Sequence, residues 1–204
     1  VALQGDIGGV LQIQGGISST GYRNAVPPSD VSKLDADDLL QGGSAVIVAG
    51  NVGGGIIFDV PPKDNDPANK DEDNDGIEDS KEGSAVVLTK GSAAAVQIGS
   101  ATANTAIGPV AGTAAGGHGI VINGSILGDG AYKDIQGNGL VIGGLGGNVS
   151  VAGGMTVNGS VSASSNAANA TAVRLGSGAT VPTIKTVGAI TATGGSTATT
   201  LVRG

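Results

Sequence analysis

Short apolar runs recur along the whole chain, and glycine flanks most of them. The runs are rich in β-branched residues, and several alternate apolar with small or polar side chains. Short length, β-branched enrichment and glycine punctuation predict strands rather than helices. The predicted strands are Val10–Ile13, Ala45–Val48, Gly55–Phe58, Ala85–Leu88, Ala95–Ile98, Ile120–Ile122, Leu140–Ile142, Val149–Val151, Met155–Val157, Val161–Ser162, Ala172–Leu175, Ala189–Thr191 and Thr200–Val202.

A degenerate internal repeat indicates that these strands stack in coils. The tetrapeptide Gly43–Val46 recurs as Gly83–Val86, and about 22 of the intervening positions belong to one polar segment. Without that segment the offset is about 18 residues, close to the spacing between Ile120 and Leu140. We therefore expect coils of about 20 residues that bury a continuous core only when stacked.

Composition favours a narrow core. The chain has 204 residues, of which 39 are glycine, and its only aromatic residues are Tyr22, Phe58 and Tyr132. Small side chains fill a thin, repeated cross-section but leave voids in a wide globular one. This balance favours an all-β solenoid or sandwich, as one domain over residues 1–204, and it disfavours a compact enzyme domain.

Charge and cysteine content narrow the function classes. The net charge is −7, and ten of the seventeen acidic residues fall between Asp59 and Glu82. The ten basic residues are scattered, so no basic stripe is available for a nucleic acid. The absence of cysteine excludes disulfides and thiolate metal sites. No apolar run approaches the roughly 20 residues of a membrane span. The chain opens with Val1 rather than Met, so we expect a mature or trimmed part of a longer precursor.

Two segments interrupt the strand pattern. We call residues 22–40 the irregular segment and residues 61–82 the acidic segment. In the irregular segment, Ser29 or Asp30 is expected to cap a short helical turn that carries Val31, Leu34 and Leu39. The acidic segment is expected to be an insertion that leaves the stack at a turn, where binding sites of solenoids often lie.

The acidic segment carries the sharpest chemical signal in the chain. Residues 71–82 fit the spacing D-x-D-x-D-G-x5-E, in which alternate carboxylates and a glycine turn surround one calcium ion. The predicted ligands are Asp71, Asp73, Asp75, the carbonyl of Ile77, Asp79 and Glu82. Flanking prolines and strands argue against an EF-hand domain. The loop resembles the calcium loops of thrombospondin type 3 repeats and of bacterial surface proteins. Asp59, Asp64 and Asp66 are candidates for a second ion.

Other motifs carry weaker signals. His118 is the only histidine, and it stands in a glycine-rich stretch where we expect a turn residue rather than a catalytic one. Asn123, Asn148 and Asn158 each stand beside a short strand and glycine, where asparagine tolerates turns and stacks in ladders. The glycine runs match neither a P-loop nor a dinucleotide-binding fingerprint.

The chain resembles the passenger regions of autotransporter-like bacterial surface proteins, particularly those of alphaproteobacteria such as sphingomonads. The resemblance is carried by residues 14–23, residues 32–43, the acidic loop and residues 174–182. It implies a right-handed parallel β-solenoid that is exported and displayed at the cell surface.

These observations predict a non-enzymatic, calcium-stabilised structural or adhesive solenoid outside the cell. Such a segment would act as a stalk, an adhesin, or a subunit of a filament or surface layer. Unpaired end coils would favour a homo-oligomer or filament, and a surface glycan or protein is the alternative partner. The alternative function is a carbohydrate-active or glycan-binding β-helix. Catalysis there would require paired acids and aromatic subsites, whereas here the acids cluster in one segment and aromatics are nearly absent.

Overall fold

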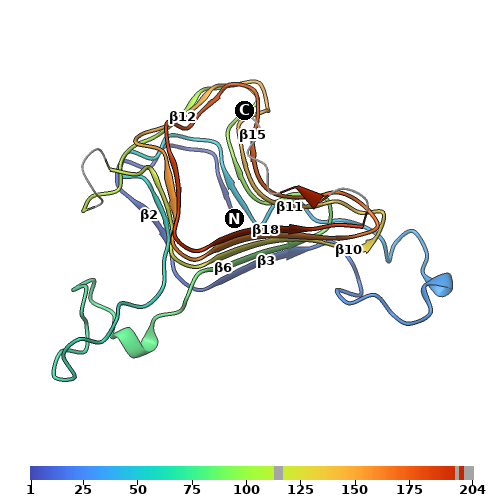
Figure 1. Ribbon diagram of the computed structural model, residues 1–204, viewed down its shortest axis with the longest axis horizontal. Coiled ribbons are helices and arrows are strands. Elements are labelled where there is room, and N and C mark those ends of the chain that lie inside the picture. Colours follow the sequence, from blue (N-terminus) through green and yellow to red (C-terminus); the bar gives the residue numbers. More distant parts are fainter. Residues whose placement is uncertain (113–116, 196–197, 200–204) are drawn as a thin grey trace.

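The computed structural model describes residues 1–112, 117–195 and 198–199, and it is a parallel β-solenoid (Figure 1). Every pairing between its named strands is parallel. The predicted all-β solenoid class is therefore confirmed. In Figure 1 the chain runs counterclockwise and advances toward the viewer from the N-terminal to the C-terminal coil, which is a right-handed winding.

Each complete coil passes through four sheets in turn, which we name A to D. Sheet A contains β1 (Ala2–Leu3), β4 (Val46–Val48), β7 (Ala94–Ile98), β11 (Gly137–Ile142), β15 (Ala170–Leu175) and β19 (Ala198–Thr199). Sheet B contains β8 (Thr105–Ile107), β12 (Val149–Val151) and β16 (Ala179–Thr180). Sheet C contains β2 (Leu11–Ile13), β5 (Ile56–Phe58), β9 (Ile120–Ile122), β13 (Met155–Val157) and β17 (Ile184–Thr186). Sheet D contains β3 (Gly16–Thr20), β6 (Val86–Lys90), β10 (Ser125–Lys133), β14 (Ser160–Asn166) and β18 (Ala189–Thr193).

The predicted period of about 20 residues is wrong. Ser160 pairs with Ser125, 35 residues earlier, and with Ala189, 29 residues later. Ile120 and Leu140, which suggested the shorter period, lie in different sheets. Similar apolar triplets occur in all four sheets of a coil. The spacing of about 20 residues therefore separates two sheets of the solenoid, whereas a whole coil is longer. The predicted strand Thr200–Val202 lies outside the described residues.

The core consists of in-register columns of inward-facing side chains. One column in sheet C runs through Leu11, Ile56, Ile120, Met155 and Ile184. Its three middle members are fully buried, whereas the two end members are only partly buried. Parallel strands lie about 4.8 Å apart, so each apolar side chain rests directly on its equivalent in the next coil.

Sheets A and D converge into a narrow arm, where the inward faces of β10 and β11 from one coil pack against each other (Figure 1). The inward positions of β10 after Ile126 are Gly128, Gly130 and Tyr132. A Cβ atom added at Gly128 would overlap the backbone carbonyl of Asn138 in β11. Glycine is therefore required here because the opposing backbones touch.

The irregular segment docks on the tip of this arm. Asp30 caps a 3₁₀ turn, η1 (Val31–Lys33), by accepting a hydrogen bond from the Ser32 amide. The turn includes Val31, but it ends before Leu34 and Leu39, which were expected to lie on it. The rings of Tyr22 and Tyr132 lie 4.5 Å apart. The Tyr22 hydroxyl donates to the Gly130 carbonyl at 3.2 Å. Both tyrosines of the chain thus fasten this segment to the solenoid.

Among the described residues, helical structure is limited to η1 and a second 3₁₀ turn, η2 (Asp79–Lys81). Neither these nor any other described part forms a helix with the length and apolar character needed to cross a bilayer.

Replacing Gly128 by alanine is expected to destabilise the fold by about 1–3 kcal/mol, because opposing backbones must separate to admit the methyl group. The matched control is Gly43→Ala, where an added Cβ meets no atom within 4 Å. We expect the control to change stability by less than about 0.5 kcal/mol. Urea unfolding of both variants measures the difference, and equal midpoints would contradict the tight approach of β10 and β11.

Tyr22 is expected to titrate at higher pH than a free tyrosine. Burial first, and then the neighbouring Tyr132 and Asp129, raise the pKa of its hydroxyl. The folded protein therefore keeps this proton where the unfolded chain releases it. The resulting stabilisation is complete below about pH 10 and is lost as pH rises through the raised pKa.

The ultraviolet absorbance of tyrosinate follows this ionisation. The signal lost in Tyr22→Phe should appear only above the pH range of an exposed tyrosine. Ionisation in the ordinary range would show that the Tyr22 hydroxyl is not desolvated at the arm.

Candidate metal centre

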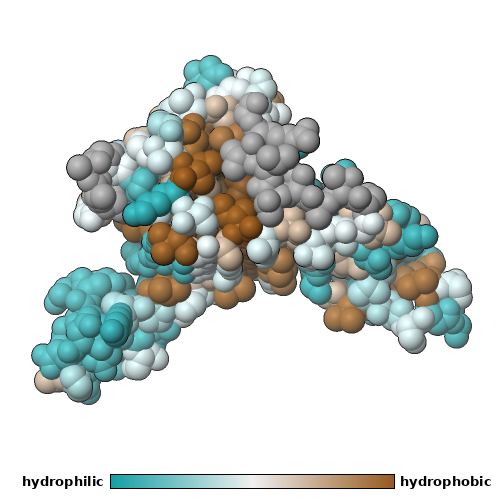
Figure 2. Space-filling model, viewed as in Figure 1, coloured by the Kyte–Doolittle hydropathy of each residue, from teal (hydrophilic) through white to brown (hydrophobic). Residues whose placement is uncertain are grey.

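The acidic segment leaves the solenoid after β5 and returns at β6, at the corner between sheets C and D. It projects from the wall as a strongly hydrophilic lobe (Figures 1 and 2). Pro61 and Pro62 follow β5, and neither can donate to a strand ladder, so pairing does not continue there. On the return, the Val86 amide donates to the Gly15 carbonyl and re-establishes pairing with the first coil.

Short backbone-to-carboxylate hydrogen bonds shape the loop. The Asp71 carboxylate accepts from the amides of Asp75 and Gly76, at 3.1 and 3.0 Å. Gly76 has φ of +91°, which favours glycine, and it makes the turn that the sequence pattern predicted. Asp79, at the start of η2, accepts from the Glu72 amide at 3.0 Å and so closes the loop on itself.

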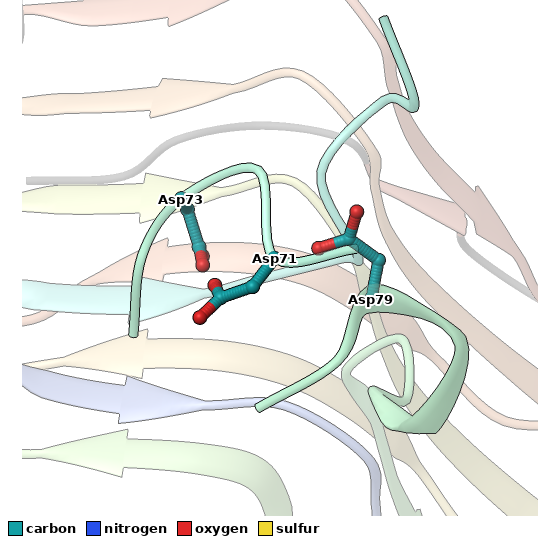
Figure 3. A group of neighbouring side chains, drawn as sticks. All are labelled: Asp71, Asp73 and Asp79. Carbon is teal, nitrogen blue, oxygen red and sulfur yellow. The ribbon is translucent and has the colours of Figure 1, made fainter. Parts of the chain in front are cut away.

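The carboxylates gather in two triads that share one member. The first triad is Asp71, Asp73 and Asp79, and the second is Asp73, Asp75 and Glu82. Within each triad one oxygen from every residue lies within 4.8 Å of the others. Figure 3 shows Asp71 and Asp73 facing each other across the loop, with Asp79 beside them from η2. Either triad can therefore hold a metal ion.

Glu82 differs from the other carboxylates in its surroundings. Each of its two carboxylate oxygens has less than 1 Å² of accessible surface, and neither has a hydrogen-bond partner. Desolvation first, and then the charges of Asp73, Asp75 and Asp79, raise the pKa of Glu82, whereas interaction with the Gln14 side-chain amide lowers it. The Gln14 side-chain nitrogen is also buried.

No neighbouring cation offsets this charge within the described part of the chain. The ion pair that lies nearest to the triad residues in the sequence joins Lys81 to Glu78 at 3.2 Å. Among the described residues, no ion pair involves a member of either triad. For Asp73, desolvation is again the largest cause of a raised pKa; the Asp75 amide opposes it, while the charges of Asp75 and Asp71 add to it. Such a cluster of oxygen ligands suits a hard cation.

Five of the six predicted ligands are thus brought together, although in two groups rather than one. The carbonyl of Ile77 as a ligand stays a prediction, and the residue is exposed. Neither triad contains Asp59, Asp64 or Asp66, the candidates for a separate ion. Asp59 instead accepts hydrogen bonds from Gln12 and Asn123 on the solenoid wall.

Two other sequence expectations concern the scaffold. Asn158 donates to Asn123 at 2.8 Å, so the expected asparagine ladder is confirmed for this pair. Asn148 stacks through its backbone, whose amide donates to the side chain of Asn104 at 2.9 Å. Nδ1 of His118 lies 3.1 Å from the Gly153 carbonyl, a contact between coils.

The proximity of Gln14 to the acidic segment was not predicted, because Gln14 stands 68 positions before Glu82 and is not a typical metal ligand.

Comparison of the whole chain with profiles of protein families, with curated proteins and with solved structures finds no match. The resemblance to autotransporter passenger regions therefore stays a prediction.

Proposed function

We propose that this chain is a non-enzymatic structural or adhesive segment of an extracellular, autotransporter-like bacterial surface protein, and that calcium orders its acidic segment. The observation that carries the proposal is the pair of carboxylate triads at a corner of the parallel solenoid, where no described lysine or arginine pairs with a triad residue. A bound cation would remove the repulsion that now opposes closure of the segment.

Calcium is favoured over other cations by the ligands. The triads offer only carboxylate oxygens, which exclude the soft metals and favour hard ones. Calcium accepts six to eight oxygens in irregular geometry, so three carboxylates plus carbonyls and water suit it, whereas magnesium demands a near-ideal octahedron. Exposed calcium sites of extracellular modules bind at about 10⁻⁴–10⁻³ M, which matches a partly exposed loop.

A structural role is supported by the scaffold. Its core is a set of continuous columns, and the end coils expose part of theirs: Leu3, Leu11 and Ile17 are only partly buried at one end, and Ile184 and Ile190 at the other. Figure 2 shows apolar residues in the middle of the near end, inside the outline of the coils. Columns of this kind can continue onto further coils, which supports a homo-oligomer or filament.

One observation favours an adhesive variant of this function. A hollow of about 480 Å³ beside the first triad is lined by Asp79 together with Pro61, Pro67, Asn69 and Lys70. Because Asp79 belongs to both, a cation in the triad would border the hollow, where it could bridge to a glycan or protein. Binding on a glycan array that disappears in chelator would support this variant.

Calcium is expected to protect the acidic segment from a lysine-specific endoproteinase. The segment contains Lys63, Lys70 and Lys81, and ordering of the loop should slow cleavage at the last two. The double variant Asp73→Asn/Asp75→Asn removes ligands from both triads and should be cleaved equally fast with calcium and with chelator. Asp64→Asn, which removes a charge outside the triads, should remain protected.

Lys33 in the irregular segment provides an internal control, since its cleavage should not respond to calcium. Equal cleavage at Lys70 and Lys81 with and without calcium in the unaltered protein would overturn the calcium assignment.

Electron microscopy of negatively stained protein tests the structural role. Uniform fibres in calcium would support a polymerising subunit, and their loss in chelator would place the acidic segment at or near the assembly contact. Isolated short rods in both conditions would contradict self-assembly and leave the stalk or adhesin role.

A further inference from the structure

A hollow of about 430 Å³ lies between the irregular segment and the tip of the arm, away from the acidic segment. We call it the arm hollow. The irregular segment contributes Pro27, Val31, Leu34 and Leu39 to its lining, and the end of β10 contributes Tyr132. A concave site of this size, lined by aliphatic and aromatic side chains with few polar groups, is typical of sites for small apolar ligands.

The apolar side chains of the irregular segment are left open to solvent. Val31 is 57% exposed and Leu39 is 43% exposed, although both line the arm hollow. Val26 and Leu40 in the same segment are also exposed. Figure 2 shows apolar residues at the surface of this lobe. Large apolar side chains that stay exposed together indicate a surface that binds a ligand or partner.

Hydrogen bonds to the solenoid hold the irregular segment in place beside the arm hollow. The Tyr132 hydroxyl donates to the Asn24 carbonyl at 2.8 Å, and Nζ of Lys90 donates to the Ala25 carbonyl at 2.6 Å. These contacts lie only a few residues before Pro27 in the chain. The two walls of the hollow are therefore fixed before any ligand arrives, which reduces the entropy lost on binding.

The backbone beside the arm hollow is strained. Of the four described non-glycine residues with positive φ, three lie here: Ala131, Asp134 and Ala167, with φ of +59°, +62° and +67°. Ala131 lines the hollow, and the other two directly follow the lining residues Lys133 and Asn166. Such conformations are unfavourable for residues with a Cβ atom, and they cluster at ligand sites.

Polar donors stand at one edge of the arm hollow. Lys133 is the one charged residue of its described lining, and no ion pair of the described residues includes it. Asn166, which pairs with Lys133 in the next coil, lines the hollow as well and offers an amide donor. An ammonium group beside an amide suits a carboxylate, since hydrogen bonds to charged groups are the stronger ones.

We propose that the arm hollow binds a free single-chain fatty acid, with the alkyl chain against Val31, Leu39 and Tyr132 and the carboxylate on Lys133 and Asn166. An apolar cavity of about 150 Å³ accommodates benzene, so 430 Å³ leaves room for an alkyl chain. A peptide fits less well, because its backbone polar groups would lack partners among these apolar side chains. This site is separate from the calcium loop, and the inference goes beyond the proposed structural function.

Calorimetric titration of the whole chain with decanoate, below its micelle concentration and in chelator, tests the site. We expect one decanoate per chain, with affinity rising up to about fourfold per methylene from hexanoate to decanoate. Leu39→Asn should weaken binding about tenfold, because it places a polar group in the lining. Val187→Thr changes an exposed valine outside the lining and should have no effect. Circular dichroism establishes that each variant is folded.

Replacing Lys133 separates the head group from the alkyl chain. Lys133→Gln should weaken octanoate binding about tenfold and leave octanol binding unchanged, because octanol carries no charge. Lys63→Gln removes the same charge in the acidic segment and should bind octanoate normally. Equal loss of octanoate and octanol in Lys133→Gln would overturn the role of Lys133.

Three results would overturn the fatty-acid site. The first is no saturable binding of decanoate. The second is equal decanoate affinity in Leu39→Asn and the unaltered protein. The third is a dimer, seen by sedimentation without any fatty acid, that Leu39→Asn disperses, since a second copy of the chain would then occupy the arm hollow.

Discussion

In-register parallel stacking is the constraint on which the rest of this structure depends. Adjacent coils are separated by about 4.8 Å, so each side chain meets its equivalent from the next coil at close range. Apolar residues gain from this arrangement, as in the column through Ile56, Ile120 and Met155. Asparagines also gain, because each amide can donate to the next, as Asn158 does to Asn123. Like charges would repel at the same distance.

Stacking also explains where the charges lie. Within sheet D the opposed charges Lys90 and Asp129 occupy paired positions and lie 3.8 Å apart. No such compensation is possible for a dense run of carboxylates, which would face one another if several coils carried it. The acids are instead concentrated in one connection that leaves the wall between β5 and β6. In-register stacking, which builds the scaffold, therefore favours a position outside the wall for the carboxylates.

Most of the strands could be predicted from the sequence because β-branched triplets bounded by glycine are typical of strands. The longest strand, β10, was missed for a physical reason. Its inward positions include Gly128 and Gly130, which look like turn residues until the facing backbone of β11 is known. The length of a coil was misjudged for a related reason. All sides of the coil carry similar triplets, so the full turn is revealed only by pairing between coils, such as that of Ser125 with Ser160.

The candidate site shows the same division between local and distant information. The spacing of Asp71, Asp73 and Asp75 around a turn is local, and the sequence was sufficient to predict it. The separation into two triads depends on Glu82, whose carboxylate is shielded by the corner at Gln14 in another coil. That contact exists only because β6 pairs with β3, so the scaffold determines the environment of the last ligand.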